Sequence, residues 1–176
     1  LGQVAQAWNI EAERLRGQPP LRRLLLANKV TRGFARSLTV LSLYASAAGA
    51  PGMAVFLLAS LFNKLLLEAL NYLEHYGLVR SPETPYALRH AWDTDRAFSH
   101  VVLIHLPMHS EHHLQPLTHF ESLHAQPRET PLLPCGYLAA LVLTLLPPVW
   151  HKVMAPKLAE WDQRFATPGE RALAHG

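Results

Sequence analysis

Three histidines fall within five residues of this chain, in the stretch PMHSEHHLQP at residues 107–116. His109, His112 and His113 have the i, i+3, i+4 spacing that presents side chains on nearly the same side of a helix. Imidazole binds Fe, Zn and Cu well, and the absence of a cysteine partner argues against a structural zinc knuckle. The stretch therefore predicts a metal site.

The other histidines carry weaker signals. His105 precedes His109 by about one helical turn and is a further candidate for the cluster. The rest lack a partnered spacing, and we expect them at the surface or beside the ligands: His90, His100, His119, His124, His151 and His175. Because the chain has 11 histidines, crowding by chance is the competing interpretation. The sequence has no Ser-His-Asp pattern, no glycine-rich phosphate loop and no EF-hand spacing.

A second polar pattern lies in NKLLLEALNYLEHYG, where Lys64, Glu68, Asn71 and His75 are spaced by four, three and four residues. This spacing places all four on one face of a helix that is otherwise rich in leucine. In a membrane helix such a face turns toward a bundle interior or an aqueous cavity, because contact with lipid is costly. His75 is either a metal ligand or a hydrogen-bonded core histidine beside a Lys64–Glu68 ion pair.

The apolar stretch SLTVLSLYASAAGAPGMAVFLLASLF begins at Ser37, and the GAPG at its midpoint signals a turn. We predict an αα-hairpin with helices at about 31–48 and 51–76. A bilayer core requires about 20 helical residues. The first arm reaches that length if Arg32 and Arg36 extend their charges to the membrane surface. Two buried core helices of a soluble protein are the alternative.

The basic residues predict the orientation of this hairpin. The GAPG turn has no charge, whereas lysines and arginines gather before the first arm: Arg14, Arg16, Arg22, Arg23, Lys29, Arg32 and Arg36. By the positive-inside rule the N-terminal flank is cytoplasmic and the turn faces the other side. The second arm then returns everything after Leu73, including the histidine cluster, to the cytoplasm.

The C-terminal half alternates loops with short helical segments. A helix is predicted from about 95 to 113, kinked by Pro107. A proline-punctuated loop, 126–137, precedes the apolar run 138–146, which ends at two prolines. Nine residues are too few to cross a bilayer, so this run predicts a docked, interfacial or re-entrant helix. A polar tail follows at 155–176.

The composition supports a membrane-associated protein of one domain's length. The chain has 176 residues, of which 49% are hydrophobic and 16% charged, against about 25% charged in soluble domains. The net charge is only +3, and the basic residues gather at 14–23 rather than alternating with aromatics, which argues against nucleic-acid binding. A single cysteine, Cys135, excludes an internal disulfide. The expected fold class is all-α, an integral-membrane helical bundle with a transmembrane hairpin, a cytoplasmic histidine-box helix and a docked C-terminal helix.

Four motifs, in this order, carry a resemblance to a known family: NYLEHYGLVR (71–80), HSEHH (109–113), LPCGY (133–137) and LPPVWHKVM (146–154). Together they resemble the C-terminal part of the alkane 1-monooxygenase family, the integral-membrane, histidine-ligated non-haem di-iron hydroxylases related to fatty-acid desaturases. RHAWDTDRAFSH is similar, more loosely, to the linking segment of that family. The resemblance covers about residues 70–155, and the preceding hairpin by its architecture.

The resemblance implies a set of iron ligands and a reaction. The ligands of two iron ions fall on His75, His109, His112 and His113, and the residues that orient them on Asn71, Glu74, Tyr76 and Glu68. The family hydroxylates the terminal C–H bond of alkanes or alkyl chains with O2. Its electrons come from rubredoxin, which rubredoxin reductase keeps reduced with NAD(P)H. The implied location is the inner (plasma) membrane, multi-pass, with the active site facing the cytoplasm.

This chain also departs from the family pattern. Pro107 and Met108 replace the polar pair that precedes the histidine box, and the loop after Arg80 is short. The two earlier histidine motifs of the family, one of HExxH type and one ending in a His pair, do not occur. We therefore expect a C-terminal portion of a membrane di-iron hydroxylase that is inactive alone. It would comprise a cytoplasmic basic flank (1–30), a membrane hairpin (31–76) and a cytoplasmic catalytic region (77–176).

Two kinds of rival function remain. A fatty-acid desaturase or an aromatic side-chain hydroxylase of the same superfamily would use the same iron chemistry on another substrate. A non-catalytic membrane protein would use its histidines to bind zinc or nothing.

The predicted orientation can be tested by cysteine labelling. A cysteine introduced at Ala50, in the uncharged turn, should react with an impermeant reagent from the periplasmic side, and one at Ser81 should not. Equal labelling of both positions, or the reverse pattern, would contradict the orientation.

Overall fold

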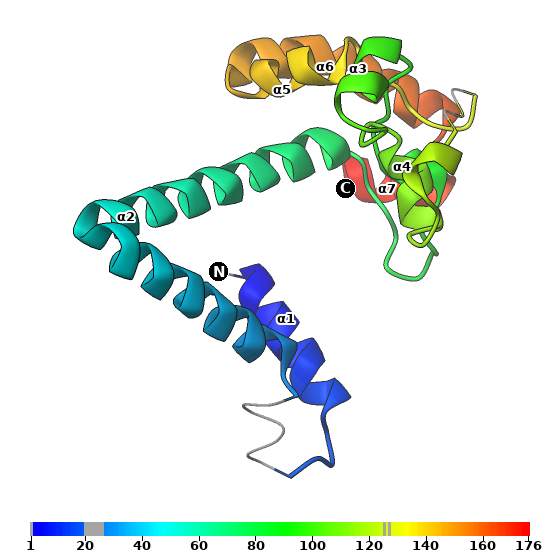
Figure 1. Ribbon diagram of the computed structural model, residues 1–176. Coiled ribbons are helices and arrows are strands. Elements are labelled where there is room, and N and C mark those ends of the chain that lie inside the picture. Colours follow the sequence, from blue (N-terminus) through cyan, green and yellow to red (C-terminus); the bar gives the residue numbers. More distant parts are fainter. Residues whose placement is uncertain (1, 20–26, 125, 127) are drawn as a thin grey trace. The chain divides into compact units, whose positions relative to one another are not determined.

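The computed structural model describes residues 2–19, 27–124, 126 and 128–176 (Figure 1). The described residues form helices and loops, with one isolated parallel bridge between Asp93 and Leu132 and no other strand pairing. The predicted all-α class is confirmed. The helices are α1 (Gly2–Arg14), α2 (Lys29–His75), α3 (Ala97–Val102), α4 (His109–Leu114), α5 (Tyr137–Thr144), α6 (Pro147–Arg164) and α7 (Pro168–His175), with 3-10 turns η2 (Leu88–His90) and η3 (Phe120–Ser122).

The chain forms two compact units, Leu1–Lys64 and Leu65–Gly176. In the first unit, α2 breaks at Gly49, whose backbone has φ +61° and ψ −144°. Glycine suits this position because other residues rarely adopt a positive φ. A side chain at Gly52 would meet the carbonyl oxygen of Tyr44 at 2.3 Å, so the two arms can approach only over a glycine there. The turn predicted at GAPG is therefore confirmed.

Helix α2 is long and apolar enough to cross a membrane. An apolar stretch of 18 residues within it has a mean hydropathy of 1.8. None of that stretch is buried, whereas the core helix of a soluble protein is mostly buried. The exposed apolar side chains include Phe34, Leu38, Leu43, Val55, Leu57, Leu58, Leu61 and Phe62. These properties fit a membrane protein.

The second unit is built around three buried tryptophans. Trp92, Trp150 and Trp161 are each at most 2% exposed and pack in one cluster with Leu73 and Met154. The indole of Trp92 donates to the Tyr76 carbonyl at 2.8 Å, and that of Trp161 donates to the Arg89 carbonyl, also at 2.8 Å. Because indole buries a large apolar area and has a single N–H donor, each of these bonds fixes a backbone carbonyl relative to the core.

The continuous helix predicted over 95–113 is wrong. The structure has two short helices, α3 and α4, because Ile104 and His105 adopt positive φ values of 50° and 60° and reverse the chain between them. Pro107 disfavours helical geometry in the residue before it, and its ring nitrogen has no hydrogen to donate. The break therefore comes before the proline, as a tight turn rather than as a kink.

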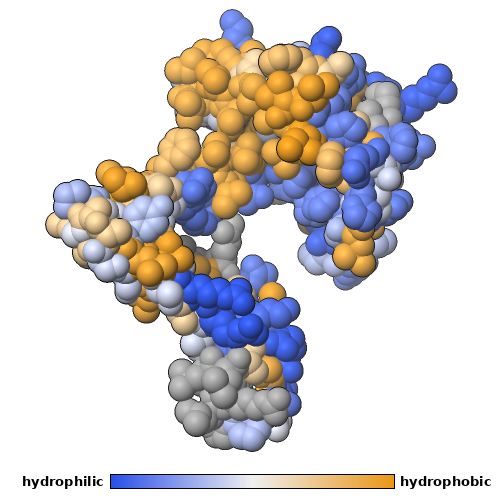
Figure 2. All heavy atoms as spheres, viewed as in Figure 1, coloured by the Kyte–Doolittle hydropathy of each residue, from blue (hydrophilic) through white to orange (hydrophobic). Residues whose placement is uncertain are grey.

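The polar tail predicted at 155–176 is helical, in the second half of α6 and in α7. The prolines Pro147 and Pro148, expected to end the apolar run, occupy the first turn of α6, where a missing N–H costs nothing. The apolar run itself forms α5 as expected, with Tyr137 and Ala140 buried and Val142 exposed. Figure 2 shows the hydrophobic surface that the exposed face of this region presents.

Gly77 lies two residues after His75, the last residue of α2, and turns the chain out of the helix. Its φ is +68°, and a Cβ atom there would lie 2.5 Å from Cδ2 of Leu158. The Leu78 amide then donates back to the His75 carbonyl at 3.2 Å, so the helix closes directly after its last histidine. The position of Gly77 in the NYLEHYG motif therefore requires glycine, both for its positive φ and for the close contact with Leu158.

We predict that Gly77→Ala lowers the free energy of unfolding by about 1–2 kcal/mol, the usual cost of a left-handed alanine. Gly169→Ala is the matched control, because its added Cβ meets nothing within 4 Å and its φ is not in the left-handed region. Denaturant unfolding of the detergent-solubilised protein, followed by tryptophan fluorescence, measures both. Equal stability of the two variants would contradict the assignment.

Candidate metal centre

Three histidines from two distant parts of the sequence converge in the second unit. His75 is the last residue of α2, and His109 and His113 lie on α4. The Nε2 atom of His109 lies 3.3 Å from that of His75 and 2.8 Å from that of His113. One nitrogen from each ring falls in a set whose members all lie within 4.8 Å of one another. Nitrogens bound to one ion at about 2.1 Å are typically roughly 3 Å apart, so this group can hold one metal ion.

Helix α4 is anchored by the serine of its HSEHH motif. Ser110 is completely buried; its amide donates to Oδ1 of Asp93 at 2.9 Å, and its hydroxyl donates to the Ala91 carbonyl at 3.1 Å. Burial raises the pKa of Asp93 to about 7, so the contact is a hydrogen bond that Oδ1 accepts in either protonation state. Ser110 thus fixes one side of a six-residue helix while His109 and His113 share another.

The ring orientation of His75 follows from its hydrogen bond. Its Nδ1 lies 3.0 Å from the carbonyl oxygen of His90. Since a carbonyl can only accept, Nδ1 carries a proton, and in the neutral ring the lone pair is then on Nε2. That lone pair is on the atom that faces His109. A backbone carbonyl bound to the far nitrogen is the usual way in which proteins fix a metal-binding imidazole.

Two of the three imidazoles on α4, those of His109 and His113, are held in the neutral form. Burial, followed by the positive charge that His113, His75 and His112 would carry, lowers the pKa of His109 to about 3. Burial also lowers the pKa of His113, with His75 and His112 adding to the effect. Metal ions bind the deprotonated ring, so these histidines offer lone pairs at neutral pH without first losing a proton.

A buried carboxylate lies beside the three histidines. Glu74 is 3% exposed, and its Oε2 is 3.4 Å from Nε2 of His109. Its other oxygen, Oε1, accepts a short hydrogen bond from the hydroxyl of Tyr137. Burial raises the pKa of Tyr137 well above its ordinary value, which keeps the phenol protonated as a donor. Glu74, expected to orient a ligand, is thus placed where it can contact one.

The remaining predicted residues lie outside the three-histidine group. His112 is exposed, and its ring centroid is 6.3 Å from that of His109 and 6.2 Å from that of His113. Asn71 and Glu68 have exposed side chains on α2. Tyr76 stacks on His151 with ring centroids 5.8 Å apart and packs against the tryptophan core. The ligand role of His112 and the orienting roles of these three residues stay predictions.

His112 and His109 both line an apolar pocket of about 330 Å³. The other lining residues come from the turn after α3 and from the loop around η3: Leu103, Ile104, His105, Leu106, Phe120 and Leu123. His105, considered as a further ligand, instead directs Nδ1 at the Phe120 carbonyl, 3.0 Å away. The histidine group thus borders an apolar space.

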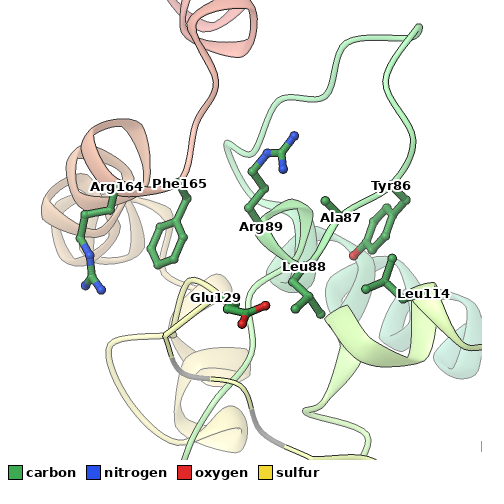
Figure 3. A pocket seen from close by; sticks show the side chains of 8 residues that line it. All are labelled: Tyr86, Ala87, Leu88, Arg89, Leu114, Glu129, Arg164 and Phe165. Atoms are coloured by element: carbon green, nitrogen blue, oxygen red, sulfur yellow. The ribbon is translucent and has the colours of Figure 1, made fainter.

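Several residues near the group had no sequence signal that selected them. Tyr86 lies with its ring centroid 4.8 Å from that of His113, and it lines a surface pocket of about 400 Å³ with Leu88, Leu114 and Phe165 (Figure 3). Tyr137, the last residue of LPCGY, reaches Glu74 across 63 residues. His90 is buried, and only its place in the loosely matched RHAW segment pointed toward it.

Comparisons with known proteins agree with the motifs. A model of the fatty acid desaturase family matches residues 1–140, which include His75, His109, His112 and His113. The xylene/toluene monooxygenase hydroxylase component of Pseudomonas putida is 39% identical over 99% of this chain and 47% of its own length. Alkane 1-monooxygenase 1 of Pseudomonas aeruginosa is 36% identical over 96% of this chain and 46% of its own length. An alkane 1-monooxygenase of Pseudomonas putida is 32% identical over 91% of this chain and 40% of its own length. The resemblance seen in the motifs is confirmed, and the chain spans about half the length of these relatives.

We predict that His75→Ala, His109→Ala and His113→Ala each weaken Co²⁺ binding by about tenfold or more, because each removes one of three converging nitrogens. His119→Ala and His175→Ala are controls, since both side chains are exposed and outside the group. Isothermal titration of the purified protein with Co²⁺ measures the affinities. If the two sets of variants behave alike, the assignment of the metal centre fails.

Proposed function

We propose, from the premise that this chain belongs to the fatty acid desaturase family, that it forms part of a membrane-bound non-haem di-iron monooxygenase. Its reaction would hydroxylate the terminal C–H bond of an alkane or an alkyl chain. The observation that carries the proposal is the convergence of the NYLEHYG and HSEHH motifs on one group of imidazoles beside an apolar pocket.

The donor set fits iron. Imidazole suits Fe, Zn and Cu, and three rings leave positions on an ion free for further ligands. His75, His109 and His113 would hold one iron. His112, whose ring lies outside that group, would contribute to a second iron with histidines from the rest of the protein. When bound, the two irons would supply the activation of O2, with one oxygen atom entering the C–H bond and the other leaving as water.

The protein's own contribution is to fix the ligands. The His90 carbonyl holds the ring of His75, and Ser110 holds α4 against Asp93. The carboxylate of Glu74, held by Tyr137, stands beside His109. Ligands restrained in this way keep their geometry while a substrate enters, which lowers the cost of arranging the site for reaction.

The apolar pocket is the feature that favours a hydrocarbon substrate. Its volume of about 330 Å³ is at the lower end of ligand pockets, and five of its lining side chains are apolar: Leu103, Ile104, Leu106, Phe120 and Leu123. A hydrocarbon gains about 25 cal/mol for each Å² of surface that it removes from water, and it needs no hydrogen-bond partner. Bound there, it would lie next to His109 and His112, at the site of oxidation.

Further parts of the proposal concern the electrons and the membrane. The reaction consumes two electrons for each O2, so a reduced donor must dock, and rubredoxin with its reductase fills this role. The hairpin of α2 would cross the inner membrane and leave the histidines on the cytoplasmic side, where that donor is found. The apolar substrate would enter from the lipid.

Hydroxylation of a methyl group on an aromatic ring is the second candidate. It is favoured by the 39% identity to a protein named as a xylene/toluene monooxygenase hydroxylase component, which exceeds the identity to the alkane 1-monooxygenases compared above. A methyl carbon is the reacting atom in both cases, so the same iron site serves both reactions. Desaturation of a fatty acid and non-catalytic zinc binding are further outcomes that an experiment must distinguish.

The decisive experiment joins this chain to an N-terminal portion that carries the HExxH and His-pair motifs of a relative. With rubredoxin, its reductase and NAD(P)H, the joined protein should bind two irons and convert n-octane to 1-octanol with one atom from ¹⁸O2. A methyl-hydroxylated product from p-xylene alone would favour the second candidate. An alkene product or a zinc-loaded protein would contradict both.

We predict that the 176-residue chain by itself gives no product under the same conditions. Three of its histidines converge and His112 is one further candidate, which is too few to hold two irons in a site with open positions. The joined protein with His113→Ala serves as the inactive control. Hydroxylated product from the chain alone would show that its remaining histidines build a different site.

A further inference from the structure

A fully buried carboxylate joins the C-terminal helices to the segment that holds His75. Glu170, on α7, has 0% exposure. Its Oε2 accepts from Nε of Arg89 at 2.9 Å and from the Thr167 amide at 2.8 Å. Its Oε1 accepts from Nη2 of Arg89 at 3.0 Å and from Nε2 of His90 at 2.7 Å. Both carboxylate oxygens are therefore satisfied, as a buried charge requires.

The direction of the bond from His90 follows from its other ring nitrogen. The Ala87 amide donates to Nδ1 of His90 at 3.0 Å, so Nδ1 has no proton and Nε2–H donates to Glu170. Burial by itself would raise the pKa of Glu170, but the hydrogen bonds from Arg89, Thr167 and His90 outweigh it and lower the pKa to about 2. Glu170 is thus a carboxylate that binds two neighbouring side chains at once.

The same two residues are also fixed through their backbone. The Arg89 carbonyl accepts from the indole of Trp161 on α6, at 2.8 Å. The His90 carbonyl accepts from Nδ1–H of His75, at 3.0 Å. Residues 89 and 90 are therefore held by α6 and α7 on one side, and they hold the ring of His75 on the other. The family match ends at residue 140, before either of these helices begins.

We propose that Glu170 is a positioning residue of the metal centre: through Arg89 and His90 it fixes the carbonyl that aims Nε2 of His75 at the metal. The inference rests on the proposed function, because it assumes that His75 binds a metal ion. It assigns α7 a role in a site that its own side chains do not touch. Outer partners of this kind typically contribute about 10–100-fold to metal affinity.

A double-mutant cycle on the purified protein, titrated with Co²⁺, tests the proposal. Glu170→Ala should weaken binding by about 10–100-fold. In a His75→Ala background the same change should have no further effect, because no ring is left to orient. Glu170→Gln, which keeps an oxygen that can accept from His90, should recover most of the loss. Glu160→Ala on α6 is the matched control. In the part of the chain that the structure describes, Glu160 pairs with Lys157 and Arg164 of its own helix, so its loss should leave the affinity unchanged.

The outcomes separate positioning from mere stability. If Glu170→Ala weakens binding by the same factor with and without His75, the residue acts on the whole fold and the proposal is overturned. Unchanged affinity in Glu170→Ala overturns it as well. If Glu170→Ala does not fold, Arg89→Lys takes its place in the cycle, because it keeps the charge and loses the two-pronged contact with Glu170.

A metal-free measurement distinguishes failure of this inference from failure of the proposed function. The ¹⁵N spectrum of the histidine rings should show His75 as the Nδ1–H tautomer in the unaltered protein, with that preference lost in Glu170→Ala. If the protein binds no Co²⁺ but the tautomer responds, the metal function fails while the link from Glu170 to His75 stands. If Co²⁺ binds and the tautomer is unchanged, the link itself is wrong.

Discussion

The need to hold three imidazole nitrogens close together governs the second unit of this protein. Protonated rings at these distances would repel one another, and neutral rings stay together only when their far sides are held. Hydrogen bonds to the backbone meet this need. The His90 carbonyl accepts from the ring of His75, and Asp93 accepts from the Ser110 amide in the helix that carries His109 and His113. The tryptophan core then fixes the loop that supplies the carbonyl.

Much of this arrangement could be predicted because it is encoded locally. The GAPG turn and the apolar arms follow from glycine conformation and hydropathy. The pairing of His75 with the HSEHH motif is implied by the family resemblance rather than by spacing, and the structure brings His75 together with His109 and His113. His112 shows where spacing is insufficient. At about 100° per residue, His113 lies about 40° from His109 on one side, whereas His112 lies about 60° away on the other. A group of three that includes His75 can use the first pair and not the second.

The features that could not be predicted depend on contacts between distant residues. Tyr137 reaches Glu74 across 63 residues, and Glu170 reaches His90 across 80, so neither leaves a periodic pattern in the sequence. The break before Pro107 and the helical start at Pro147 share another cause. Proline permits a turn, a kink or a first helical turn, and only the packing around it selects one. The prolines therefore predict a change in the backbone at their positions, but not which of these structures forms there.

The shortness of α4 has a consequence for the life of the protein in a cell. A helix of six residues has no stability of its own, because so few hydrogen bonds cannot offset the cost of starting a helix. The contacts of Ser110 with Asp93 and Ala91 hold α4 in place, and a bound ion would add to this folded segment the free energy that its binding releases. The fraction of molecules with this segment closed would then follow the supply of metal. In cells short of the metal, molecules with this segment open would be degraded by proteases before the closed ones. The amount of protein, rather than the turnover of each molecule, would then fall with the metal supply.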